Sequence, residues 1–240
     1  MDLELSDHHE LLRRTVREFA EAEVAPVAGE LDRTHAIPYD LIAKLGALNL
    51  MGIPFPEEYG GGGGDTFAYT LTVEELARVD SSVAITLCAH TSLGTQPIYL
   101  YGTDEQREEW LPRLCSGSIL GAFGLTEPEG GSDAGNTRTR AVLDDDTRTG
   151  TGGWVIDGAK QFITNAGTDI SGLVTITALT GEREISNFLV PNGTPGYEQV
   201  WISSSPTTTS CSGARCASSP RRRSRRSPAS STVRTRSRTT

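Results

Sequence analysis

Residues 121–135 read GAFGLTEPEGGSDAG, and no other stretch of the chain is as informative. An apolar run ends at Leu125, a proline turn follows at Pro128, and a pair of glycines precedes Ser132. Paired glycines allow backbone N–H groups to face a phosphate closely, and a serine hydroxyl adds a further donor. The stretch therefore indicates either an anion-binding loop at the end of a strand or an ordinary glycine-rich turn.

Similar apolar runs follow this stretch toward the C-terminus. Short runs separated by clusters of Gly, Asp, Asn and Thr are typical of strands. Together with the first run, they predict strands at residues 119–125, 137–143, 154–163, 173–179 and 185–190. The acidic and glycine-rich residues 144–153 fit the tip of a long hairpin. An all-β domain is therefore predicted from residue 119 to about residue 199.

The chain before residue 119 has a different pattern, in which hydrophobic residues recur at helical spacing. Ser6, one of Ser81 and Ser82, and Asp104 are predicted N-caps of three helices. Five consecutive glycines, residues 60–64, are predicted to form a loop between helices, because no strand precedes them and no Gly-Lys-Ser/Thr follows. Residues 1–118 are therefore predicted to be an all-α domain.

Charge is unevenly distributed along the 240 residues, whose 22 basic and 31 acidic side chains give a net charge of −9. Nine arginines fall in residues 201–240, which leaves 13 basic against 31 acidic residues in residues 1–200. This excess of acidic residues in residues 1–200 disfavours binding to nucleic acid and to anionic membranes. Histidine and cysteine spacing predicts no metal site. With no signal segment and no apolar run near the ~20 residues of a membrane helix, the chain is predicted to be cytoplasmic.

Residues 201–240 are rich in Arg, Ser and Thr and have almost no large apolar side chain after Ile202. Such a composition buries too little apolar surface to offset the entropy of ordering, so this tail is predicted to be disordered. Two origins remain open for it. It is either a basic segment that binds nucleic acid or the out-of-frame translation of a G+C-rich gene.

Three blocks of the sequence resemble the acyl-CoA dehydrogenase family. GLTEPEGGSD at residues 124–133 is similar to the first signature of that family. GAKQFITN at residues 158–165 is similar to its Lys-x-Trp-Ile-Thr-Asn block, and PEEYGG at residues 56–61 is similar to its Pro-x-x-Tyr-Gly-Gly loop. The resemblance runs in order from residue 1 to about residue 199.

The resemblance implies a three-part fold: an N-terminal helical domain, a middle β-barrel that binds FAD, and a C-terminal four-helix bundle. The chain is then an α+β multidomain protein with a helical domain at 1–118, an incomplete antiparallel β-barrel at 119–200 and a disordered tail at 201–240. The reaction implied is α,β-desaturation of an acyl-CoA, with the α-hydrogen leaving as a proton and the β-hydrogen as a hydride to FAD. An electron-transfer flavoprotein is the implied electron acceptor, and intact family members form homo-oligomers.

The resemblance also implies which residues bind FAD: Phe123, Leu125, Thr126, Gly131, Ser132, Phe162, Ile163 and Thr164. Thr126 would bond the pyrimidine edge of the flavin, and Thr164 would donate near N5. Phe162 would pack on the isoalloxazine, where the family more often has Trp. Ser132 would contact the pyrophosphate and also bind the CoA part of the substrate. We expect the strand ends after Leu125 and near residue 163 to be neighbours, with Thr126, Ser132 and Thr164 on one side.

No catalytic residue is predicted in the chain. The family base is a Glu of the C-terminal bundle, and residues 201–240 contain no Asp, Glu, His or Lys. Glu127 and Asp133 match acids of the first signature and are interpreted as structural residues that hold the loop. The sequence therefore predicts a truncated, inactive acyl-CoA dehydrogenase. The alternative is a non-catalytic module that binds flavin or acyl-CoA and carries a basic nucleic-acid-binding tail.

Overall fold

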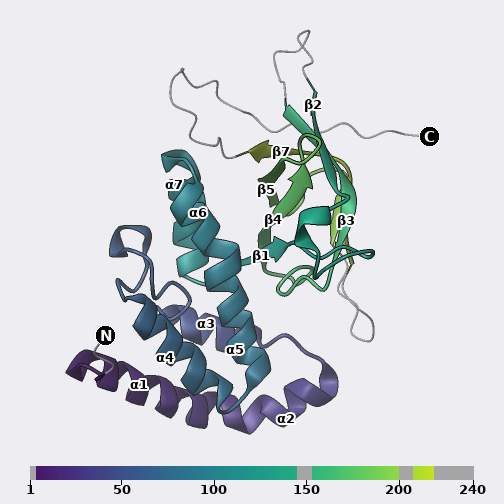
Figure 1. Ribbon diagram of the computed structural model, residues 1–240. Helices are drawn as coiled ribbons and strands as arrows, with labels where there is room; N and C mark the ends of the chain where they lie inside the picture. Colours follow the sequence, from purple (N-terminus) through teal and green to yellow (C-terminus); the bar gives the residue numbers. More distant parts are fainter. Residues whose placement is uncertain (1–3, 145–152, 200–207, 219–240) are drawn as a thin grey trace. The chain divides into compact units, whose positions relative to one another are not determined.

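The computed structural model describes residues 4–144, 153–199 and 208–218 of the chain. They fall into two compact units, one ending at Leu120 and the other beginning at Gly121 (Figure 1). Helices make up the first unit, and a sheet makes up the second. This order confirms the predicted α+β fold.

The helical unit is built from helices, several of which follow one another directly, and its longest connection covers residues 48–65. Within it α1 lies alongside α4, and α4 alongside α5 (Figure 1). Its elements are α1 (Asp7–Phe19), the π-helical η1 (Ala20–Val24), α2 (Ala25–Thr34), α3 (Tyr39–Ala47), the 3₁₀ turn η2 (Glu57–Tyr59), α4 (Thr66–Ala77), α5 (Ser81–Cys88), the π-helical η3 (Ala89–Thr95), α6 (Gln96–Tyr101) and α7 (Asp104–Cys115). The core contains fully buried leucines from α4, α5 and α7, such as Leu76, Leu87 and Leu111, whereas α2 has no buried residue.

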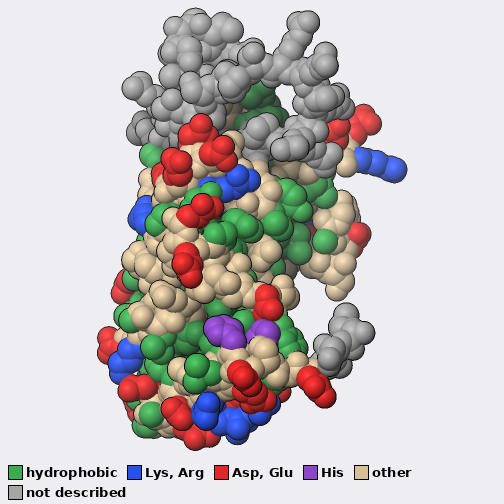
Figure 2. All heavy atoms as spheres, turned by 90° about the vertical axis from the view of Figure 1, so that its left-hand side faces the viewer, with side chains coloured by type: hydrophobic (Ala, Val, Ile, Leu, Met, Phe, Trp, Pro, Cys, Tyr) green, Lys and Arg blue, Asp and Glu red, His purple; other side chains and the backbone are tan. Residues whose placement is uncertain are grey.

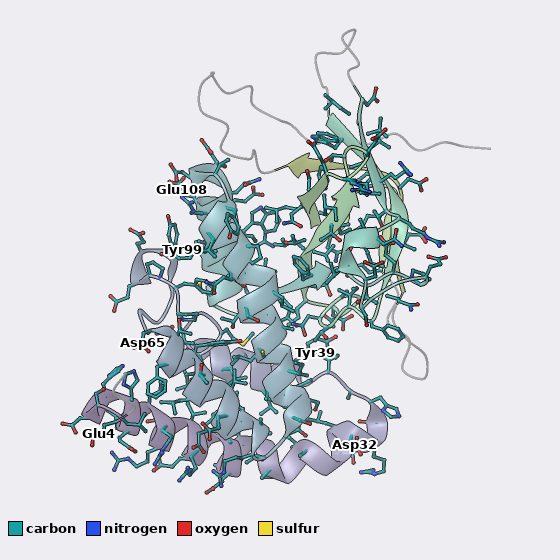
Figure 3. The ribbon with its side chains drawn as sticks, in the orientation of Figure 1. Glu4, Asp32, Tyr39, Asp65, Tyr99 and Glu108 are labelled. Carbon is teal, nitrogen blue, oxygen red and sulfur yellow. The ribbon has the colours of Figure 1, made fainter. Side chains whose placement is uncertain are left out.

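Side-chain caps begin four of these helices. Ser6 caps α1 as predicted, Asp65 caps α4 (Figure 3), Asp80 caps α5 and Thr103 caps α7. The predicted caps of α5 and α7 are wrong and lie slightly too late in the chain. Asp80 and Thr103 keep extended backbone, so their side-chain oxygens can accept from the first free N–H groups of the helix.

His9 ties together the starts of α1 and α4. Its Nδ1 lies 2.8 Å from Ser6 Oγ, and its Nε2 lies 3.2 Å from Asp65 Oδ1. The ring also meets Phe67 edge to face, with 5.2 Å between the centroids. Figure 2 shows histidine side chains on one face of the molecule, with acidic and basic side chains around them.

A buried carboxylate joins α1 to α4. Glu75 is 2% exposed and accepts from Arg17 Nε at 2.9 Å and Arg17 Nη2 at 2.7 Å. Arg78 Nη1 adds a third bond at 2.8 Å. The hydrogen bonds from Arg17 are the main cause of a lowered pKa at Glu75. The carboxylate is therefore ionised and fully paired at neutral pH.

The second unit is a mixed sheet. Its strands are β1 (Leu120–Gly124), β2 (Arg140–Asp144), β3 (Gly153–Gln161), β4 (Ser171–Leu179), β5 (Ile185–Pro191), β6 (Tyr197–Gln199) and β7 (Thr208–Ser218), with a 3₁₀ turn η4 (Ala134–Asn136) before β2. They pair in the order β1-β4-β2-β3-β7-β5, β6 pairs with β7, and β4 also pairs with β5. The long pairings β2–β3, β3–β7 and β4–β5 are antiparallel.

The predicted antiparallel barrel is not confirmed, because two of the contacts between strands are minimal. β2 meets β4 in parallel through the single register pair Arg140↔Leu179. β5 meets β7 through only two pairs, Phe188↔Ser218 and Leu189↔Ala217. So few pairs leave the sheet open along these edges, although the predicted all-β character of the domain is correct.

The prediction of a disordered tail is wrong for Thr208–Ser218, which form β7. β7 pairs with β3 from Trp154↔Cys216 to Gln161↔Thr208 and also pairs with β6. A strand between two neighbours satisfies its backbone groups in the ladder, so it does not need large apolar side chains of its own. The sheet therefore continues past the predicted boundary at residue 200. The arginine-rich residues 221–226 lie outside the described residues.

The core of the sheet unit consists of alternating residues from several strands. Ile156, Val174, Ile176 and Phe188 have no exposed surface, and the ring of Trp154 packs edge to face on Phe188 with centroids 5.4 Å apart. Along β4 the opposite face is buried as well, which explains why this strand is almost continuously apolar or Thr.

No helix among the described residues is long and apolar enough to cross a membrane. In the same part of the chain, no group of three or more His, Cys, Asp and Glu side chains could hold a metal ion.

Candidate functional site

The end of β1 is held by side chains and backbone of other strands. Three successive carbonyl groups, of residues 124, 125 and 126, each accept a hydrogen bond from a different donor. The bonds are Thr177 Oγ1 to Gly124 O at 3.3 Å, Lys160 Nζ to Leu125 O at 3.2 Å, and Gln161 N to Thr126 O at 2.9 Å. The two sequence blocks are therefore joined directly, which confirms that the two strand ends are neighbours.

Glu127 closes the loop that follows. Its carboxylate accepts from the hydroxyl of Thr137, the N–H of Arg138 at 2.6 Å, and the N–H and hydroxyl of Thr139 at 3.0 and 2.6 Å. Lys160 Nζ donates to the same carboxylate at 2.7 Å. One side chain thus ties the start of the loop to its end and to β3. This geometry supports the interpretation of Glu127 as a structural residue.

The charges of Glu127 and Lys160 are both buried, with 5% and 1% of each side chain exposed. Burial raises the pKa of the Glu127 carboxyl, but the hydrogen bonds from Lys160, Thr137, Thr139 and the Arg138 N–H outweigh it. They lower that pKa to about 2, from a usual value of 4.5. Glu127 is therefore an anion at neutral pH, and its lowered pKa makes it a weak proton acceptor.

The glycine-rich part of the loop is exposed. Glu127 N–H donates to Gly130 O at 2.8 Å and Gly130 N–H donates back at 3.2 Å, which closes a tight turn over Pro128. Gly131 and Ser132 follow on the surface. A shallow, solvent-open recess lies here, lined by Leu125, Glu127, Gly130, Gly131, Asp133, Ala134, Asn136 and Thr137. It has room for about one water molecule, so it does not enclose a cofactor by itself.

The second block, residues 158–165, begins inside β3 and extends past the end of that strand. The strand stops at Gln161, two residues before the predicted end, because Phe162 adopts a left-handed backbone with φ of +59°. Its ring is 62% exposed. A bulky residue in this conformation is a strained outlier, and such outliers cluster at ligand sites. Phe162 therefore presents an aromatic face directly after the residue that bonds Thr126.

Of the next three residues, the first and third are buried and the second is exposed. Ile163 is 4% exposed and belongs to the core cluster, so only its backbone can reach a ligand. Thr164 is exposed. Asn165 is 4% exposed, has φ of +70°, and its Nδ2 lies 3.5 Å from Gly121 O at the start of β1. Asn165 therefore links the end of the second block to the start of the first.

The hydroxyls singled out by the resemblance are available to a ligand. Within the part of the chain that the structure describes, no hydrogen bond engages the side chains of Thr126, Ser132 or Thr164. Thr126 also borders the glycine loop, since a Cβ built on Gly131 would lie 3.4 Å from Thr126 Cγ2. Leu125, at the edge of the recess, is 36% exposed, whereas Phe123 on β1 is half-buried. Available hydroxyls close to an exposed aromatic ring fit a flavin nucleotide.

Lys160, Thr137, Thr139 and Thr177 are site residues to which the sequence gave no role. Lys160 lies inside the second block, and its place in that block is the signal that could have found it. The three threonines lie outside both blocks, 10 to 50 residues from Glu127, so nothing in the sequence links them to it.

Two family models match the chain in order. The N-terminal domain of acyl-CoA dehydrogenase matches residues 6–118, and the middle domain of acyl-CoA dehydrogenase matches residues 122–217. The chain belongs to the acyl-CoA dehydrogenase family. The second match includes β7, in agreement with the place of that strand in the sheet.

Individual relatives agree with this membership of the acyl-CoA dehydrogenase family. A probable acyl-CoA dehydrogenase of Bacillus subtilis, YngJ, is 43% identical over 218 residues, which are 86% of this chain and 55% of the relative. Butyryl-CoA dehydrogenase of Megasphaera elsdenii has a similar structure, with a TM-score of 0.79 and 34% identity over 90% of this chain and 58% of that one. A glutaryl-CoA dehydrogenase of Mycobacterium smegmatis in complex with FADH2 gives a TM-score of 0.80 and 31% identity over 90% of this chain and 56% of that one. The chain thus spans a little over half the length of these relatives.

Proposed function

We propose that the chain provides the flavin side of an FAD-dependent acyl-CoA dehydrogenase. The observation that carries this proposal is the hydrogen bond from Gln161 N–H to Thr126 O, which brings the two sequence blocks together at one end of the sheet. The similarity to a relative with bound FADH2 supports FAD as the cofactor. The available hydroxyls and the exposed Phe162 ring support it independently.

Each residue of the site has a role in this proposal. Thr126 donates to the pyrimidine edge of the flavin, and Leu125 and Phe123 provide apolar surface beside it. Phe162 gives the isoalloxazine a π-face, as aromatic rings commonly do for planar ligands. Ile163 contributes through its backbone, because its side chain is in the core.

The remaining groups hold the ends of the cofactor. Gly131 and Ser132 face the pyrophosphate from the exposed loop, and Ser132 also binds the CoA part of the substrate. Thr164 donates near the reactive edge of the ring. When bound, the flavin supplies the acceptor for the β-hydride of the substrate.

Residues 1–240 alone are proposed to lack turnover. The reaction needs a carboxylate or comparable base beside the substrate α-carbon. Glu127 is buried, ionised and saturated with hydrogen bonds, so it cannot take this part. Acyl-CoA as substrate, an electron-transfer flavoprotein as partner, homo-oligomerisation and a cytoplasmic location belong to the proposal for the complete enzyme.

The alternative, a module with a nucleic-acid-binding tail, gains no support. β7 places residues 208–218 of that tail in the sheet. The rest of the tail, residues 201–207 and 219–240, lies outside the described residues.

Titration of the purified chain with FAD tests the proposal. Quenching of flavin fluorescence should show saturable binding, and Thr126→Val should weaken it about tenfold, because one hydrogen bond to the ligand is lost. Thr70→Val is the matched control, since Thr70 lies exposed on α4 and bonds only within its helix. Equal affinity for Thr126→Val, Thr70→Val and the unmodified chain would refute the assigned site.

Turnover is tested on the FAD-reconstituted chain with short, medium, long and branched acyl-CoAs. We expect no bleaching of the flavin and no dye reduction, whereas an intact relative assayed alongside should show both. Turnover within tenfold of that relative would show that a base exists inside the chain, and would contradict the proposal that residues 1–240 alone lack turnover.

A further inference from the structure

We propose that Glu127 and Lys160 are positioning residues, whose contact fixes the backbone of residues 124–126, the loop up to Thr139 and β3 as one rigid platform for the ligand. The inference deepens the proposed function and rests on it for the identity of the ligand. Neither side chain touches the cofactor in this proposal. Both act through the groups that they hold.

Lys160 is the point at which the separate segments meet. Its ammonium group donates toward Leu125 O at 3.2 Å, Glu127 Oε1 at 2.7 Å, Thr137 Oγ1 at 3.2 Å and Thr177 Oγ1 at 3.0 Å. These four acceptors lie on the end of β1, at both ends of the loop and on β4. An ordinary surface ion pair joins two side chains, whereas this ammonium fixes the relative position of three parts of the backbone.

Glu127 supplies the partners that a strand would normally supply. The segment from Thr137 to Thr139 precedes β2, and Leu179 N–H of β4 donates to Thr139 O at 2.8 Å. The N–H groups of Arg138 and Thr139 donate to the Glu127 carboxylate and not to a strand. Residues 127–139 form a long loop that would otherwise be free to vary its shape. Because Gly131 and Ser132 lie in this loop, closing it at both ends fixes where they stand.

The glycines of both sequence blocks make room for this pair. A Cβ on Gly124 would lie 3.2 Å from Lys160 Cγ, so the lysine stem packs directly over the end of β1. A Cβ on Gly158 would lie 2.4 Å from Thr139 Oγ1, which donates to Glu127. Both glycines lie within strands, and the close packing of the network leaves little room for a side chain at either position.

Stability alone does not account for a buried pair of this kind. Replacing both members of a buried ion pair by neutral groups is often neutral or favourable, while removing one member is costly. The double variant therefore distinguishes a positioning role from a stabilising role. With both charges removed, stability should recover relative to the single variants, but the geometry of the platform should not.

The test compares Lys160→Met, Glu127→Gln and the double variant in the full chain without ligand. Hydrogen exchange of the Arg138, Thr139 and Gln161 amides reports the platform directly, and FAD affinity is measured on the same proteins. Both single variants and the double variant should exchange these amides about tenfold faster or more, and should bind FAD about tenfold more weakly. The matched control is Lys44→Met, which removes an exposed pair with Glu23 on helical elements and should change neither quantity.

Thr177→Val is a milder variant, which tests the proposal if the Lys160 and Glu127 variants do not fold. Thr177→Val keeps the volume and both charges but removes one acceptor of Lys160 and the donor to Gly124 O, and it should raise the exchange rates to a smaller extent. Unchanged exchange in Lys160→Met, or a double variant that regains both stability and FAD affinity, would overturn the proposal. An unmodified chain that binds no FAD would refute the proposed function, and the exchange rates alone would then decide whether the pair positions the loop.

Discussion

Replacing Glu127 by glutamine should remove most of the acid sensitivity that this carboxylate gives to the sheet unit. The pKa of Glu127 is about 2 in the folded chain, below its usual value of 4.5. A group with a lowered folded pKa stabilises the fold fully above its unfolded pKa and loses that contribution as the pH falls through the folded value. The contribution of Glu127 is therefore complete above about pH 5 and disappears between about pH 5 and pH 2.

The magnitude follows from the same shift. Lowering a pKa from 4.5 to about 2 corresponds to about 3 kcal/mol of stability at pH 7. Breaking a buried ion pair by removing one partner typically costs about 3–5 kcal/mol, which agrees with this value. Glutamine has the shape of a protonated glutamate, so at low pH the variant and the unmodified chain should become equally stable.

Urea unfolding followed by circular dichroism at pH 7, 5 and 3 measures this difference. Glu75 also has a lowered pKa, but it titrates in both proteins, so the difference between them isolates Glu127. The exposed Glu129→Gln, in the same turn, is the control and should unfold like the unmodified chain at every pH. A Glu127→Gln variant within about 0.5 kcal/mol of the unmodified chain at pH 7, or a constant difference down to pH 3, would refute the reasoning.

Three further results are expected. Gly158→Ala should lower the free energy of unfolding by about 1–3 kcal/mol in a urea titration, because the new Cβ would lie 2.4 Å from Thr139 Oγ1; a neutral effect would contradict the close packing at this point. Arg17→Met should cost about 1–3 kcal/mol in the same assay, since it removes both bonds to the buried carboxylate of Glu75; a loss below 0.5 kcal/mol would contradict the importance of this pair. Cys115 is fully buried and its pKa is raised to about 12 by burial, so native chain at pH 8 should resist iodoacetamide at this thiol, as read by mass spectrometry, and urea should expose it; rapid labelling of the native chain would be the opposite result.

The order of the two units and the place of the site could be predicted from local patterns. Helical spacing before residue 119 and short apolar runs after it follow directly from the period of each element. The two sequence blocks carried Thr126, Phe162 and Thr164, and the structure joins those blocks at Thr126 and Gln161. The role of each side chain toward a ligand is still a prediction.

The parts that could not be predicted depend on partners far apart in the chain. Lys160 and Glu127 are 33 positions apart, and only the fold shows that they form a buried pair. β7 has the composition of a disordered segment, and its pairing with β3 joins residues that are far apart in the chain. Phe162 ends β3 early through a left-handed backbone conformation, which its residue type disfavours.

Hydrogen exchange of the full chain with and without FAD tests most directly whether the two sequence blocks form one flavin site. The account predicts that FAD slows exchange in residues 121–137 and in residues 158–166 together, at the same half-saturating concentration. Elements of the helical unit such as α1 and α2 are the internal reference and should keep their exchange rates. Protection confined to one block, or absent from both while FAD binds elsewhere, would contradict the account.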